Sequence, residues 1–77
     1  MKETTTEDIR PRPMSKTEIA RLYGRNLKDG SALNRLSYWM HLVPGLMDEL
    51  RRTGYTPRQR LLTSRQVALI FQYLGQP

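Results

Sequence analysis

Apolar residues recur every three or four positions in four short segments of the chain, and glycine or proline separates these segments. This spacing places the apolar side chains on one face of an α-helix. The first segment, residues 16–23, follows Ser15 and carries Glu18, which together form the pattern of a capping box. We expect Gly24 to end this helix in the left-handed conformation that a side chain would resist.

The second segment, residues 32–42, is predicted to begin near Ser31 and to end before Pro44, because the residue before a proline disfavours helical geometry. At 100° per residue, its apolar side chains share an arc of about 120° that would face the core. This predicted core face consists of Ala32, Leu33, Leu36, Trp39, Met40 and Val43. The opposite face carries Asn34, Ser37, Tyr38 and His41, with Arg35 at its border.

Two further helices are predicted. The third spans residues 44–53, with Pro44 at its first position and Gly54 as its C-cap. The fourth follows Thr63, which forms a second capping box with Gln66 three residues later, and ends at Gly75. Leu69 and Tyr73 of the last helix fall outside its apolar stripe. They would form an exposed pair suited to a protein partner or to a second copy of the chain.

Between the last two helices, residues 54–62 contain a Thr-Pro turn flanked by residues that could form two short strands. On such a reduced wing, Arg58 and Arg60 would share one face, because strand side chains alternate. The predicted fold is therefore mainly α, with four short helices in a helix-turn-helix or winged-helix-like arrangement. Residues 14–77 would form this domain, and residues 1–13, which hardly contain an apolar side chain, a disordered N-terminal arm.

Charge adds a functional clue, because the chain carries a formal net charge of +6. Residues 1–13 are neutral overall, so the whole excess falls on residues 14–77. A compact basic domain favours polyanionic partners, and nucleic acid before a membrane surface. The alternative is a domain that is basic without any such partner.

Catalytic chemistry finds little support in the sequence. The chain has no cysteine and one histidine, His41, so a thiolate or multi-histidine metal site is excluded. Asp48 and Glu49 are adjacent on a helix and do not face each other, and no glycine-rich phosphate loop is present. We therefore expect a protein that is not an enzyme and has no cofactor, metal or small-molecule substrate. We also expect the cytoplasm, because neither a signal peptide nor a membrane-spanning run is apparent.

Two segments resemble a family of small proteins of unknown function that is abundant in Bacteroidetes. That family has an E-[IL]-A-x-L-Y segment near its N-terminus, matched by residues 18–23. It also has a C-terminal R-L-[LF]-T-x-x-Q-V-x-L-I-x-x-x-L-G segment, matched by residues 60–75. More distantly, Arg60-Leu61-Leu62-Thr63 resembles the junction between wing and helix in winged helix-turn-helix domains of MerR-type regulators and phage excisionases. That second resemblance implies DNA contacts from residues 32–42 and from the wing.

These observations predict a small DNA-binding protein, either a transcriptional regulator or an accessory factor of a mobile element. Its partner would be double-stranded DNA, with RNA left open. The candidates for contact with base edges are Asn34, Arg35 and Tyr38, and those for contact with phosphates are Arg25, Lys28, Arg58 and Arg60. The alternative is a protein-interaction adaptor that binds its partner through Leu69 and Tyr73.

Overall fold

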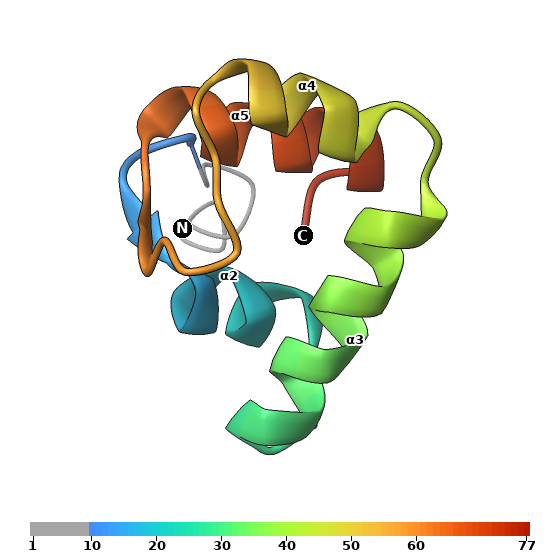
Figure 1. Ribbon diagram of the computed structural model, residues 1–77. Helices are drawn as coiled ribbons and strands as arrows, with labels where there is room; N and C mark the ends of the chain where they lie inside the picture. The colour runs from blue at the N-terminus through green and yellow to red at the C-terminus, as the bar shows by residue number, and fades with distance from the viewer. Residues whose placement is uncertain (1–9) are drawn as a thin grey trace.

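The computed structural model describes residues 10–77, which form four helices and one small two-stranded antiparallel sheet. In chain order the elements are β1 (Met14–Ser15), α2 (Lys16–Tyr23), α3 (Asp29–Leu42), α4 (Leu46–Arg52), β2 (Leu61–Leu62) and α5 (Ser64–Leu74). Helix α2 packs against α3, and α4 packs against α5 (Figure 1). The mainly α prediction with four helices is confirmed. Residues 1–9 of the predicted arm lie outside the described residues.

The core lies between the helices, and every helix contributes apolar side chains to it. On α3, the buried positions are Ala32, Leu36 and Met40, and Leu33 and the C-cap residue Val43 are partly buried against the core. Trp39 is half-buried. The stripe predicted from the 3.6-residue period therefore faces the core. From the other elements, the buried apolar residues are Met14, Ile19, Ala20, Leu46, Leu50, Tyr55, Leu62, Val67, Ile70 and Phe71.

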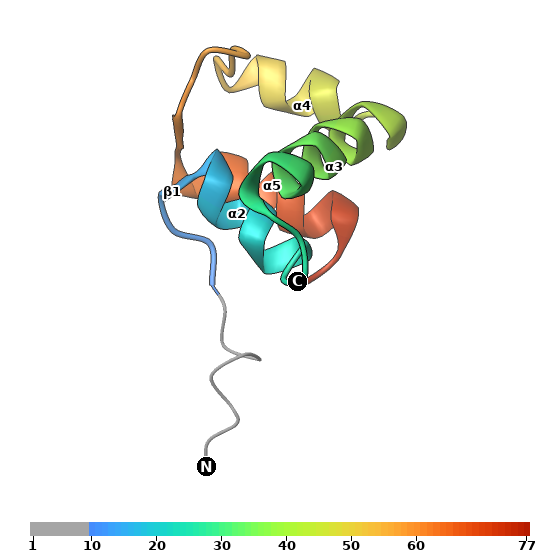
Figure 2. The same ribbon diagram turned by 90° about the horizontal axis from the view of Figure 1, so that it is seen from below.

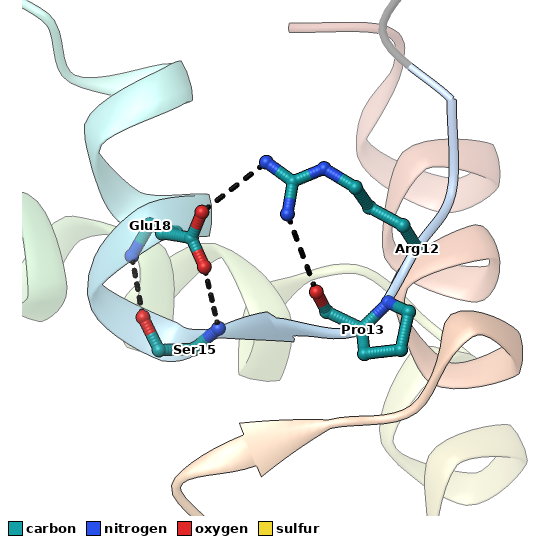
Figure 3. Close-up of polar contacts among 4 residues, drawn as sticks. All are labelled: Arg12, Pro13, Ser15 and Glu18. Carbon is teal, nitrogen blue, oxygen red and sulfur yellow. Dashed lines mark hydrogen bonds and ion pairs between the residues drawn. The ribbon is translucent and has the colours of Figure 1, made fainter.

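The start of α2 is fixed by the predicted capping box (Figure 3). The amide of Glu18 donates to the Ser15 hydroxyl at 3.1 Å, and the amide of Ser15 donates to the Glu18 carboxylate at 3.2 Å. The second carboxylate oxygen of Glu18 accepts a hydrogen bond from Arg12 at 3.2 Å. One acidic side chain thus satisfies the helix end and attaches the segment that precedes β1.

The junction between α2 and α3 differs from the prediction in two ways. Helix α3 begins at Asp29, earlier than Ser31, because Asp29 accepts two hydrogen bonds from Arg21 at 2.8 and 3.0 Å and favours the helix N-terminus electrostatically. Gly24 has φ −122°, so it is not left-handed. A Cβ there would lie 3.1 Å from Leu27 and 3.2 Å from Ala32, so glycine is needed for close approach of the chain to α3.

Helix α4 is shorter than predicted. Pro44 precedes the helix, and Gly45 (φ 89°) is the N-cap, which places the chain in a left-handed turn before Leu46. At the other end Thr53 is the C-cap and Gly54 follows it with φ 91°. The amide of Gly54 donates to the Arg51 carbonyl at 3.0 Å and that of Tyr55 to the Leu50 carbonyl at 3.2 Å, the pattern of a Schellman motif.

The predicted wing is wrong in its pairing. Strand β2 pairs with β1, in the register Met14 with Leu62 and Ser15 with Leu61, and residues 55–60 form no strand. This pairing buries Met14 and Leu62 together, each 1% exposed, and Tyr55 enters the core instead of a wing strand. Residues 53–60 form a loop from α4 to β2, drawn in yellow to orange in Figure 1.

The capping box of α5 is present as predicted, with Thr63 as N-cap and Gln66 reaching back to it. Leu69 and Tyr73, however, are partly buried and pack against the core, so they do not form an exposed apolar pair. The Tyr73 ring lies beside Gly45, where a Cβ would be 3.6 Å from it. Among residues 10–77 there is no helix with the length and apolar character that membrane crossing requires.

Tyr23, at the end of α2, links the two halves of the helical domain. Its ring meets Trp39 of α3 and Phe71 of α5 edge-on, with centroids 6.1 and 6.3 Å away, and its hydroxyl donates to the Gly75 carbonyl. Burial raises the pKa of Tyr23 to about 12, so the hydroxyl stays protonated at neutral pH.

Candidate nucleic-acid interface

Acidic side chains neutralise only part of the basic surface. Within residues 10–77 each acidic side chain forms an ion pair with an arginine: Arg12–Glu18, Arg21–Asp29, Arg51–Asp48 and Arg52–Glu49. The amide of Ser15 and then Arg12 lower the pKa of Glu18, and the hydrogen bonds from Arg21 lower the pKa of Asp29. In the same part of the chain the cations outside these pairs are Arg10, Lys16, Arg25, Lys28, Arg35, Arg58, Arg60 and Arg65.

The outer face of α3 presents the residues predicted to contact bases. Asn34, Arg35 and Tyr38 are all exposed, Tyr38 by 64%. The guanidinium of Arg35 lies 5.7 Å from the centroid of the Trp39 ring, a cation–π contact that limits its motion and leaves its N–H groups free to donate. This face therefore combines a held arginine with an amide and a phenol on one exposed helix.

Leu42, one helical turn after Tyr38, is 60% exposed and extends this face with an apolar side chain. Neither predicted face of this helix includes Leu42. The signal was available in the spacing, because residues four apart on a helix are neighbours.

A groove of ≈ 720 Å³ lies between the start of α2 and the loop after α4. Its walls are Ser15, Lys16 and Thr17 on one side, Pro57, Arg58, Gln59 and Arg60 on the other, with Leu33 of α3. The structure therefore brings Arg58 and Arg60 to the same groove, through a loop and not through the predicted wing strand. It adds Lys16, which sequence reasoning missed, and no acidic residue lines the groove.

The loop carrying these arginines is attached to both neighbouring helices. From α2, the Lys16 ammonium donates to the Pro57 carbonyl at 2.7 Å and lies 5.1 Å from the centroid of the Tyr55 ring, and the Lys16 amide donates to the Arg60 carbonyl at 3.2 Å. From α5, the side chain of Gln66 holds Gln59. These contacts fix the path of the loop and so the origin of both arginine side chains.

Arg25 and Lys28 are exposed at the start of α3 and do not line the groove. Lys28 is the N-cap of α3 and makes no side-chain capping bond. Both views of the molecule place this end of α3 away from the loop of residues 53–60 (Figures 1 and 2). The four predicted phosphate contacts thus divide into two pairs, one at the start of α3 and one at the groove.

Gln66 is the one buried polar side chain among the described residues, at 1% exposed. Its carbonyl oxygen accepts hydrogen bonds from the Thr63 amide at 3.0 Å and the Gln59 amide group at 2.6 Å. Its own NH₂ group donates to the Thr53 hydroxyl at 2.9 Å, which in turn donates to the Leu50 carbonyl at 2.6 Å. The sequence predicted only the capping bond, because the other partners lie on a separate loop.

Groups suited to metal binding or acid–base chemistry are not clustered in the described part of the chain. No set of three or more His, Cys, Asp or Glu residues in 10–77 is placed to hold a metal ion. The His41 ring nitrogen Nδ1 lies 2.9 Å from the Ser37 carbonyl on the same helix. The exposed groups on this surface are unpaired cations, together with the amide of Asn34 and the phenol of Tyr38.

A comparison with known protein families identifies the group to which the chain belongs. It is a member of the family described as Domain of unknown function (DUF4248), whose model matches residues 10–77. No curated protein and no solved structure matches the chain. Membership thus agrees with the resemblance to a small family of unknown function, and the similarity to winged helix-turn-helix domains stays a prediction.

Proposed function

We propose that this protein is a small, non-enzymatic DNA-binding protein that acts in the cytoplasm as a transcriptional regulator or as an accessory factor of a mobile element. The observation that carries the proposal is the separation of charge. The acids of residues 10–77 are all paired, while the unpaired cations include both arginines of the groove and Arg35 on α3. Such a surface attracts the phosphate backbone, and release of counterions would supply much of the binding free energy.

Helix α3 has dimensions suited to reading a duplex. Its 14 residues span about 21 Å, and the major groove of B-DNA, about 12 Å wide, accepts an α-helix. Arg35 would pair a guanine through two hydrogen bonds, Asn34 would pair an adenine, and Tyr38 would reach a base edge or a neighbouring phosphate. Leu42 would meet an apolar group such as the thymine methyl.

Phosphate contacts on either side of α3 would set its register on the duplex. Arg58 and Arg60 would bind one strand at the groove, where Leu33 of α3 forms part of the wall. Arg25 and Lys28 would bind phosphates near the start of α3. The alternative function, an adaptor that uses Leu69 and Tyr73, is less favoured because both side chains are partly buried against the core.

The test compares two double variants that remove the same charge. Arg58→Ala with Arg60→Ala deletes the unpaired arginines of the groove, and Arg51→Ala with Arg52→Ala deletes arginines already paired on α4. Binding to a random-sequence duplex is measured at several salt concentrations. Each lost phosphate contact lowers the slope of log K against log[salt] by about 0.9, so the first variant should lose about 1.8.

The control variant should change the slope little, because its arginines are not assigned to phosphates. Equal losses in the two variants would show that net charge alone governs binding. In that case the groove would not be the phosphate site. If the slope of log K against log[salt] were unchanged in the groove variant, the loop would not contact phosphates.

A further inference from the structure

The loop of residues 53–60 alternates between exposed and inward-facing side chains at its basic end. Arg58 and Arg60 are exposed, while Gln59 between them is partly buried and directed at α5. The Gln59 NH₂ group donates to the Gln66 carbonyl oxygen at 2.6 Å and to the Leu61 backbone carbonyl at 3.0 Å. In return the Gln66 NH₂ group donates to the Gln59 carbonyl oxygen at 3.4 Å.

This pair of amides connects the loop to a buried anchor. Gln66 is fixed by the α5 capping box and by Thr53, so its side chain has no freedom to follow the loop if the loop moves. A buried amide with its hydrogen bonds satisfied is a rigid point in the structure. Gln59 transmits that rigidity to the backbone between the two arginines.

We propose that Gln59 is a positioning residue for DNA binding, which holds Arg58 and Arg60 beside the groove so that both meet one phosphodiester strand. The inference rests on the proposed function. An arginine side chain loses conformational entropy when a bound phosphate immobilises it. A loop whose backbone is already fixed loses less, so the anchored loop binds phosphates more tightly than a mobile loop of the same charge.

Gln59 is suited to this role because it carries no charge and makes no contact that a phosphate would replace. Removal of the Gln59 side chain therefore changes how the two arginines are positioned without changing the net charge of the chain. Lys16 holds the other side of the loop through the Pro57 and Arg60 carbonyls, which keeps the loop near its place when Gln59 is changed. Loss of Gln59 should loosen the arginines without unfolding the domain.

The experiment measures binding of the full chain to a random-sequence duplex by fluorescence anisotropy, at low salt and across a salt series. Gln59→Ala should weaken binding about fivefold and lower the salt slope, although the net charge is unchanged. Gln72→Ala, which truncates an exposed glutamine on α5, is the matched control and should bind like the wild type. Thermal unfolding of both variants establishes that each is folded at the assay temperature.

A double-mutant cycle separates positioning from a general structural effect. In a chain that already carries Arg58→Ala and Arg60→Ala, Gln59→Ala should have no further effect on binding, because there is no arginine left to position. A fivefold loss in both backgrounds would overturn the inference and make Gln59 a merely structural residue. The inference would also be overturned if Gln59→Ala bound the duplex as tightly as Gln72→Ala does. If the wild-type chain did not bind the duplex at all, the proposed function itself would be refuted.

Discussion

Replacing Gln66 by leucine removes the buried amide while keeping an apolar side chain of similar size in the core. The change deletes three short hydrogen bonds, from the Thr63 amide, from Gln59 and to Thr53. Each such bond contributes about 1 kcal/mol net. The sum is about 3 kcal/mol, and burial of the leucine methyl groups offsets part of it.

We therefore expect Gln66→Leu to lower the free energy of unfolding by about 2–3 kcal/mol. In a domain of this size each kcal/mol shifts Tm by about 4–8 °C, so Tm should fall by about 8–24 °C. The measurement is chemical denaturation followed by circular dichroism, with a thermal scan beside it. Gln72→Leu, on the exposed face of the same helix, is the control and should change stability by less than about 0.5 kcal/mol.

The reasoning would be refuted if Gln66→Leu were as stable as the wild type or more stable. That result would mean that water or rearranged neighbours satisfy Thr63, Gln59 and Thr53 without cost. The buried amide would then be no anchor for the loop. A stable variant would thus weaken the argument for Gln59 as well.

Two other predictions concern stability. The pKa of Glu18 is lowered from 4.5 in the folded chain, so its charge stabilises the fold above that value, and this contribution is lost as pH falls through the folded pKa. The Tm advantage of the wild type over Glu18→Gln should therefore shrink below pH 4.5. A Tm difference that stays constant with pH would contradict the prediction. Gly30→Ala should raise the free energy of unfolding by about 0.4–1 kcal/mol, because nothing lies within 4 Å of the new Cβ on α3. Gly24→Ala should show no such gain, because its new Cβ would crowd Leu27 and Ala32. Equal effects in urea denaturation would show that Gly24 is not needed for close packing.

Local features of the fold were predictable from the sequence. Both capping boxes, Ser15 with Glu18 and Thr63 with Gln66, depend on residues three positions apart, so the pattern contains all the information needed. The same holds for the core stripe of α3, which follows from the helical period alone. These features give four helices in order and expose the face that carries Asn34, Arg35 and Tyr38.

Contacts between distant segments were not predictable. The pairing of Met14 with Leu62 joins segments far apart in the sequence, and no local pattern distinguishes it from the predicted wing hairpin. Tyr73 lies against the turn at Gly45, and Leu69 is partly buried against the core, and the spacing of α5 alone cannot show either contact. The left-handed N-cap at Gly45 also displaced the start of α4 from the predicted Pro44.

The candidate site likewise contains residues that could be predicted from the sequence and residues that could not. The exposed face of α3 could be predicted because it is the complement of a core stripe. Lys16 and Gln59 could not, since their roles depend on a loop that meets α2 and α5 only in the folded chain. The groove therefore emerged from the structure, although its two arginines were named from the sequence.

The most direct test of the central claim is a fluorescence-anisotropy titration of the wild-type chain with a random-sequence duplex at about 50 and about 200 mM salt. A protein that makes several phosphate contacts should bind at the lower concentration and lose orders of magnitude in affinity at the higher one. That outcome would support DNA binding and would justify selection for a specific site read by α3. Absence of binding at about 50 mM salt would contradict the account.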